Sequence, residues 1–319
     1  MSRPMSKVIC IGELLIDFVA EHHSGSIQEA AQFSKKAGGA PANVACAVQR
    51  LGQKALFAGA VGKDPFGDFL VRTIGSEGVD LSFVQRLEAF TTLAFVALSE
   101  DGERDFYFSR GADAGLIRDP RLIESIDPQD IVHFGSATAF LEGDLNETYQ
   151  QYLSEAKKRG CLISFDPNFR IDLWRSNKAE FVAQCLSFIA SADLCKFSEE
   201  EAFLISNQTS FDQAAAFFHR QGARLVCITL GQRGTFISLK GEKALVPSVS
   251  ANAIDTTAAG DAFVGALLSQ LSQHEDRSVL FEQLDRLIPL IAYANRAGAF
   301  TTQSYGAMQS LPYAKDLIS

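Results

Sequence analysis

The sequence lacks a long hydrophobic segment. Its longest uninterrupted apolar run extends only from Leu287 to Ala294, which is far too short to cross a bilayer. Near the N-terminus, Glu13 and Asp17 interrupt the apolar stretch that follows Lys7, so this stretch does not have the pattern of a signal peptide. We therefore expect no membrane partner.

Cysteine and histidine are few and scattered. The six cysteines show no CxxC spacing and most lie inside apolar runs, and the five histidines show no ligand spacing with each other or with cysteine. This arrangement argues against a zinc site. It is typical of reduced cysteines in a core, and it predicts a cytoplasmic protein.

An excess of basic residues is also absent. The chain has 319 residues, with 29 Lys and Arg against 38 Asp and Glu, which gives a formal net charge of −9. This balance argues against nucleic acid and anionic membranes as main partners. It does not exclude a small anionic ligand, because such sites are built from backbone amides, helix ends and a metal.

The sequence does contain enough apolar residues for a large core, since 47% of the chain is hydrophobic. We find no internal repeat or proline-rich linker that would divide it. Short β-rich runs alternate with helical patterns, which is typical of a mainly parallel sheet flanked by helices. The β-rich runs are 8–11, 131–134, 162–165 and 225–228, and the helical patterns are 145–159, 178–190, 199–206 and 211–221. The prediction is one doubly wound α/β domain over residues 1–319.

Two segments break this rhythm, residues 18–36 and 91–110. In the second segment, β-prone runs at 93–98 and 105–108 flank a turn centred on Asp101 and Gly102. We expect the two segments to form a small antiparallel sheet that projects from the main layer. A lid over a ligand and a surface flap without a role are equally good interpretations of these segments alone.

A first glycine-rich stretch, AGGAPAN at residues 37–43, opens a helical pattern. Gly38 and Gly39 allow the backbone to approach a ligand, and the Asn43 amide has a donor and an acceptor suited to a sugar hydroxyl. Taken alone, the stretch also fits an ordinary start of a helix. Neither a GxGxxG after the first β-rich run nor a GxxxxGK[ST] motif is present.

A second stretch of small residues, 254–263, also runs into a helical pattern. Small residues before a helix leave backbone amides directed at one point, where they stabilise a phosphate or its transition state. Asp261 falls in the first helical turn, a position that keeps a carboxylate ionised. Such an aspartate is either a catalytic base or a charge that stabilises the helix.

Together these two stretches, with the other motifs below, make the chain resemble the PfkB, or ribokinase-like, carbohydrate kinases, and within that family the bacterial fructokinases. The resemblance covers nearly the whole chain, and the motifs follow the order that the family has. They are residues 12–17, 37–45, 61–67, 166–170, 196–201, 229–234 and 255–263.

The resemblance implies a ribokinase-like fold and an ATP-dependent kinase whose lid, 18–36 and 91–110, closes over a sugar. D-fructose, phosphorylated at its 6-hydroxyl, is the expected substrate. A 2-keto-3-deoxygluconate kinase or a ribokinase-type enzyme is the alternative, and the sugar acid would call for a cation among Arg104, Arg110 and Arg170. A non-catalytic sugar or nucleoside sensor is the alternative from a different class. Mg²⁺, activation by K⁺ and a homodimer formed through the lid are further implications.

The resemblance also assigns roles by motif position. Asp261 is the expected base. The other residues expected to be catalytic are the anion-hole residues Ala258, Ala259 and Gly260, and Arg170. The expected sugar-binding residues are Asp17, Gly38, Gly39, Asn43, Phe106, Phe108 and Asp255. The expected nucleotide-binding residues are Asn168, Lys196, Thr229, Gly231, Gly234 and Asn295. Glu201 is expected to organise Mg²⁺ through its waters, with Asp255 and Thr257 near the monovalent cation.

Two positions depart from the family pattern. Ala258 stands where the family has the first glycine of the anion hole, and a positive φ there would cost alanine about 1–2 kcal/mol. Loss of an anion-hole donor would cost roughly 2.7–4 kcal/mol, but alanine keeps its N–H, so we predict a working kinase. Ser198 replaces an asparagine, and we expect the change to affect Mg²⁺ affinity.

Overall fold

A nine-stranded sheet forms the centre of the structure, a computed structural model that describes residues 6–21, 26–98 and 104–318. The strand order is β13-β12-β11-β10-β9-β8-β1-β4-β5. From β5 to β11 all neighbours pair in parallel, and only β11–β12 and β12–β13 pair antiparallel. The strands are β1 (Lys7–Ile11), β4 (Lys54–Gly62), β5 (Asp80–Leu87), β8 (Ile131–Phe134), β9 (Leu162–Phe165), β10 (Leu194–Ser198), β11 (Leu225–Thr229), β12 (Thr235–Leu239) and β13 (Glu242–Val246).

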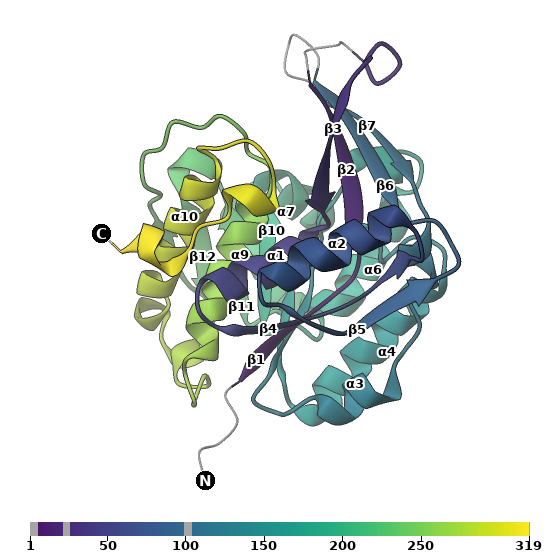
Figure 1. The fold of residues 1–319 in the computed structure, drawn as a ribbon. Coiled ribbons are helices and arrows are strands. Elements are labelled where there is room, and N and C mark those ends of the chain that lie inside the picture. The colour runs from purple at the N-terminus through teal and green to yellow at the C-terminus, as the bar shows by residue number, and fades with distance from the viewer. Residues whose placement is uncertain (1–5, 22–25, 99–103, 319) are drawn as a thin grey trace.

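Helices cover both faces of this sheet (Figure 1). Alternation along β1 sends Val8 and Cys10 into one apolar layer and Ile9 and Ile11 into the other. The first layer packs under α1 (Ala40–Arg50), α2 (Pro65–Ser76), α9 (Ala259–Ser272) and α10 (Ile288–Thr301). The second packs under α3 (Pro120–Ser125), α4 (Asp144–Arg159), α6 (Lys178–Ile189), α7 (Glu199–Ser206) and α8 (Phe211–Gln221). The predicted doubly wound α/β architecture is confirmed.

Short helical segments complete the chain. They are α5 (Ile171–Trp174) and the 3-10 turns Ala112–Gly115, Gly231–Arg233, Leu280–Glu282, Leu284–Arg286, Met308–Ser310 and Ala314–Leu317. Each helix in the described ranges is too short or too polar to span a bilayer.

A second sheet of four strands, which we call the lid sheet, projects from the top of the body in Figure 1. Its order is β3 (Phe33–Gly38), β2 (Leu15–Ala20), β6 (Leu93–Leu98) and β7 (Arg104–Ser109). The outer pairs are antiparallel, but β2 and β6 are parallel, so the prediction of a purely antiparallel sheet was wrong. Both strands follow strands of the main sheet that run in the same direction, β1 and β5, and therefore leave it in the same direction. The predicted turn at Asp101 and Gly102 lies outside the described residues.

The pairing register gives the lid sheet two different faces. Asp17 lies opposite Lys36 and Ala94, and Ala94 lies opposite Phe108, so these side chains share one face. The other face carries an aromatic cluster. In this cluster Phe18 stacks on Phe95 with ring centroids 5.2 Å apart. The face with Asp17 is the one that meets the buried polar groups described next.

Candidate active site

The beginnings of α1 and α9 meet at the carboxyl edge of the main sheet. Asn43 Nδ2, on α1, donates to Asp261 Oδ2, on α9, at 2.8 Å. Both side chains are buried, and Asn43 Oδ1 has no hydrogen-bond partner among the described residues. A buried acceptor without a partner points to a ligand donor such as a hydroxyl group.

Asp17 reaches the same place from β2 because Gly38, on the neighbouring strand, has no side chain. A Cβ atom at Gly38 would lie 1.9 Å from Asp17 Oδ2. Burial raises the pKa of Asp17 to about 7; the charge of Asp261 also raises it, whereas Arg170 and Lys36 lower it. The predicted sugar-binding residues Asp17, Gly38 and Asn43 are thus brought together beside Asp261, and Gly39 is the N-cap of α1.

Asp261 is 7% exposed and lies in the first turn of α9. Burial raises its pKa to about 6, while the hydrogen bond from Asn43 lowers it. A carboxylate with a pKa close to the working pH is suited to accept a proton from an alcohol. This geometry fits the predicted base.

Ala258 has a left-handed backbone, with φ 59° and ψ 8°, and it is the N-cap of α9. This is the conformation in which alanine is strained. Ala259 N donates to Thr256 O at 3.3 Å, and the amides of Gly260 and Asp261 bond to no acceptor in the described residues. Free amides at the start of a helix form an anion site, here centred on Gly260 and Asp261.

Lys196 lies next to this anion site, beside Gly260. Its Nζ lies 3.0 Å from Asp166 Oδ2, and a Cβ atom at Gly260 would lie 3.1 Å from the same Nζ. Burial lowers the pKa of Lys196, but the nearby carboxylates of Asp166, Glu201 and Asp261 outweigh burial and raise it. The ammonium therefore stays charged next to the free amides.

The loop after β9 holds Arg170 against this site. Arg170 Nη2 donates to Asn168 Oδ1 at 3.1 Å, and Nη1 donates to Phe169 O at 3.0 Å. Asn168 Nδ2 in turn donates to Gly135 O at 2.8 Å. The guanidinium charge lowers the pKa of both Asp17 and Asp261, so Arg170 lies near both carboxylates.

Glu201 and Ser198 form a capping box at the start of α7. Glu201 Oε2 accepts from Ser198 N at 2.7 Å, and Ser198 Oγ accepts from Glu201 N at 3.2 Å. Glu201 Oε1 also accepts from Phe169 N at 2.8 Å. Glu201 therefore ties the Arg170 loop to α7, a role that its sequence position did not predict, and the Ser198 hydroxyl is used in the cap.

The predicted nucleotide-side residues are partly engaged with the protein itself. Thr229 Oγ1 donates to Phe197 O at 3.2 Å, and Gly231 and Gly234 flank the turn after β11. The Asn295 amide donates to Val246 O at 3.0 Å and accepts from Thr235 Oγ1 at 2.6 Å. Asn295 therefore fixes the end of β13 in place, and its contact with adenine stays a prediction.

The Asp255 loop lies beside the C-terminal segment. Asp255 Oδ1 accepts from Thr257 N at 2.9 Å and from Thr257 Oγ1 at 2.6 Å, and Oδ2 accepts from Gly306 N at 3.0 Å.

The two predicted aromatic sugar contacts come from the lid sheet. Phe106 and Phe108 lie on its Asp17 face, with ring centroids 6.2 Å apart.

Arg110 is bonded to the protein itself. It forms hydrogen bonds to Asp113 Oδ2, Thr138 O and Glu142 O. The side chain of Arg104 lies outside what the structure describes. Sequence reasoning gave no role to Asp166, the partner of Lys196, although Asp166 opens the DPNFR motif that was recognised.

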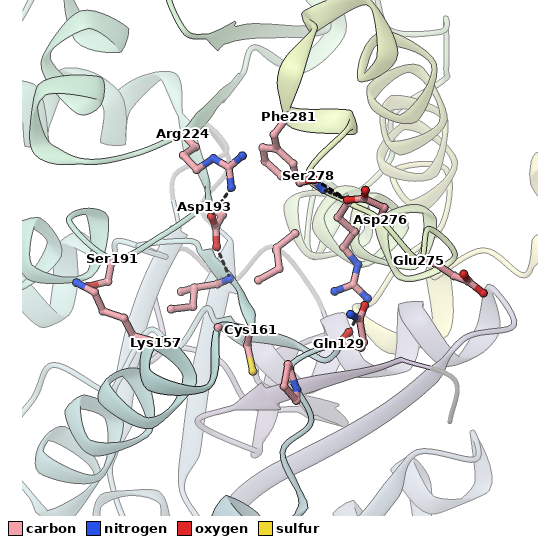
Figure 2. Close-up of a pocket in the computed structure, with 15 residues that line it drawn as sticks. Gln129, Lys157, Cys161, Ser191, Asp193, Arg224, Glu275, Asp276, Ser278 and Phe281 are labelled. Atoms are coloured by element: carbon pink, nitrogen blue, oxygen red, sulfur yellow. Dashed lines mark hydrogen bonds and ion pairs between the residues drawn. The ribbon is translucent and has the colours of Figure 1, made fainter. Parts of the chain in front are cut away.

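A cavity of about 430 Å³ lies at the opposite edge of the main sheet (Figure 2). Four of its lining residues lie just before strands of the sheet, namely Gln129, Cys161, Asp193 and Arg224. Arg224 forms an ion pair of 3.1 Å with Asp193, and none of the predicted site residues lines the cavity. The candidate site is instead at the carboxyl edge, where open α/β sheets bind ligands.

Comparison with known proteins identifies the family. The family model described as pfkB family carbohydrate kinase matches residues 5–314. The chain belongs to the pfkB family of carbohydrate kinases. It is 39% identical over 311 residues to "Probable fructokinase-2" of Arabidopsis thaliana, and the alignment covers 96% of this chain and 92% of the relative. It is 40% identical over 309 residues to fructokinase-1 of Zea mays, and this alignment covers 96% of this chain and 94% of the relative.

Solved pfkB-type structures have the same fold. The fructokinase of Vibrio cholerae O395, with bound fructose, ADP and calcium, superposes with a TM-score of 0.87 at 32% identity, covering 98% of each chain. The fructokinase of Xylella fastidiosa with bound ATP has a TM-score of 0.85 at 29% identity, covering 98% of this chain and 96% of that one. The predicted ribokinase-like fold and the phosphotransferase class are confirmed.

The strain at Ala258 is testable by substitution. In the Ala258→Gly variant the free energy of unfolding should rise by roughly 0.5–1.5 kcal/mol, because glycine adopts a positive φ without the clash of a Cβ atom. Urea unfolding measures this change. The matched control is Ala259→Gly, one residue later inside the helix, which should lower the free energy of unfolding by roughly 0.5–1 kcal/mol. A decrease in both variants would show that Ala258 is not strained.

Proposed function

We propose that this kinase transfers the γ-phosphoryl group of ATP to the 6-hydroxyl of D-fructose. The observation that carries the proposal is the position of Asp261, buried at the start of α9 between a sugar-side group, Asn43, and free helix amides. The relatives named fructokinases, and the Vibrio cholerae enzyme with fructose and ADP bound, support this choice of sugar.

The residues of the site divide the work of the reaction. Asp17 and the free Asn43 Oδ1 bind sugar hydroxyls and bring one of them to Asp261. Asp261 accepts the proton of that hydroxyl as its oxygen bonds to the γ-phosphorus, and the bond from that phosphorus to the bridging oxygen of ADP breaks. Phosphoryl transfer depends mainly on such positioning and on neutralised charge.

The amides of Gly260 and Asp261 and the Lys196 ammonium stabilise the negative charge on the transferred phosphoryl group. Fixed donors of this kind act where negative charge develops, and they need no reorganisation during the reaction. Arg170, held by Asn168, adds a second cation on the sugar side. Thr229, Gly231 and Gly234 would lie on the nucleotide side.

We propose that Mg²⁺ enters with ATP. The described residues contain no group of three or more His, Cys, Asp or Glu side chains that would form a protein cage for a metal. This fits Mg²⁺, which keeps waters and binds through one or two carboxylates and the phosphates of the substrate. Asp166 and Glu201, both near Lys196, are the carboxylates that would face those waters. When bound, the metal neutralises phosphate charge.

Three further proposals concern the wider protein. Asp255 and Thr257 would lie beside an activating K⁺, and equal rates in potassium and sodium salts would contradict this. The aromatic face of the lid sheet, with Phe18 and Phe95 at its centre, would form a homodimer interface, and a monomer in sedimentation velocity would contradict that.

All six cysteines are buried free thiols, which fits a cytoplasmic location. Cell fractionation tests this location.

A panel of acceptors separates the proposed function from its alternatives. In a coupled ADP-release assay, fructose should be turned over with the highest kcat/KM, ahead of ribose, 2-keto-3-deoxygluconate and adenosine. Because Arg110 is bonded to the protein, use of the sugar acid would depend on Arg170. A preference for 2-keto-3-deoxygluconate would replace fructose as the substrate, and sugar binding without any turnover would indicate a sensor.

The pH dependence of kcat/KM tests the role of Asp261. Its pKa of about 6 means that the ionised base is lost as the pH falls through 6, whereas an ordinary aspartate would stay ionised to about pH 4. We expect kcat/KM for fructose to fall at least about tenfold per pH unit below this value, because Asp17, with a pKa of about 7, is also protonated in this range. The coupling enzymes, assayed alone at each pH, are the control. A flat profile down to pH 5 would contradict the assignment.

A further inference from the structure

Two buried carboxylates lie outside the phosphoryl-transfer site and take no part in the reaction as described. They are Glu13, which follows β1, and Asp113, in the 3-10 turn after β7, and each is 1% exposed. A carboxylate buried to this extent needs hydrogen-bond donors. The donors come from segments that contact the sugar site and the lid sheet.

Glu13 holds the start of the sugar-binding helix. Its Oε1 accepts from Ala40 N, the first residue of α1, at 3.1 Å, and from Ala137 N at 3.3 Å. Its Oε2 accepts from Ser136 Oγ. Because Asn43 is one turn further along α1, Glu13 fixes the position of Asn43 relative to the loop 136–139.

Asp113 bonds to the chain just before β6 and just after β7, at the end of this strand pair that joins the body. Its Oδ1 accepts from the hydroxyl of Thr92, the residue before β6. Its Oδ2 accepts from Arg110 Nε at 3.2 Å, close after the end of β7. Gly111 N also donates to Thr92 Oγ1 at 2.9 Å. The two points at which this half of the lid sheet joins the body are therefore bonded to one carboxylate.

The two carboxylates meet on the loop 136–139. Thr138 Oγ1 donates to Asp113 Oδ2 at 2.7 Å, and Thr138 N and Ala139 N donate to Ser136 Oγ, the group that bonds Glu13. Burial raises the pKa of Glu13 to about 7, and the charge of Asp113 contributes to this rise. A continuous buried network thus connects the start of α1 with the base of the lid.

We propose that Glu13 and Asp113 are positioning residues, which hold the sugar-binding end of α1 and the base of the lid sheet in one arrangement. Loss of a bond in this network would let the lid residues and Asn43 shift relative to each other, which weakens sugar binding and leaves the nucleotide side intact. The inference rests on the proposed function, because it takes Asn43 and the lid as sugar contacts.

The test breaks the network at Thr138 and compares the two substrates. In Thr138→Val the KM for fructose should rise about five- to tenfold, as expected for one lost hydrogen bond in a buried network, while the KM for ATP stays within about twofold. Thr138→Ser keeps the hydroxyl and should restore the wild-type KM. The matched control is Thr73→Val on α2, whose hydroxyl donates within its own helix, to Phe69 O, and to nothing else in the described part of the chain.

A second break keeps the test valid if Thr138→Val does not fold. Thr92→Val removes the bond at the lid end and should give the same selective rise in the fructose KM. Equal increases for both substrates, or a lower melting temperature with an unchanged fructose KM, would overturn the positioning role. If the wild-type enzyme does not phosphorylate fructose, the proposed function fails, and the same comparison is made with the sugar it does phosphorylate.

Discussion

The hydrogen bond from Asn43 to Asp261 joins two helix starts that are far apart in the sequence. Around this bond the chain places its other polar groups: Asp17 across Gly38 on one side, and Lys196 below Gly260 on the other. In both cases a glycine makes room for a charged side chain. The site therefore depends on close approach between backbone and charge: a Cβ atom at Gly38 would displace Asp17, and one at Gly260 would crowd the Lys196 ammonium.

Charge is balanced within the site and not over the whole molecule. The net charge of −9 gives no hint of an anion site, yet Lys196 lies next to the free amide of Gly260, and the Arg170 charge acts on Asp261. Burial raises the pKa of both Asp17 and Asp261, and the charge of Asp261 raises that of Asp17 further, whereas Arg170 lowers both. Burial, the Asp166 charge and the opposing cations Arg170 and Lys196 together place the pKa of Asp261 where a base can work near neutral pH.

Much of the fold could be predicted because local pattern determines it. The strands 131–134 and 162–165 and the helices 199–206 and 211–221 have the predicted bounds, since each combines an apolar period with turn residues at its ends. Ala258 could also be predicted from its place in a motif, and its φ of 59° is the strained value considered for it.

Contacts between distant segments could not be predicted in the same way. The parallel pairing of β2 with β6 depends on the direction in which two remote strands leave the main sheet. The bonds of Asn295 to the end of β13, and of Arg110 to Asp113, link residues whose partners no motif indicates. The sequence offered Asn295 as a contact of adenine and Arg110 as one candidate cation for a sugar acid, and it gave no sign of these bonds within the protein.

In the proposed reaction Asp261 is the base, and sugar binding depends on its neighbours. The most direct measurement compares kcat with the fructose Kd, determined by calorimetry, for Asp261→Ala. We predict a fall in kcat of at least about a hundredfold, with the fructose Kd changed only a few-fold. A kcat close to that of the wild type would contradict the account.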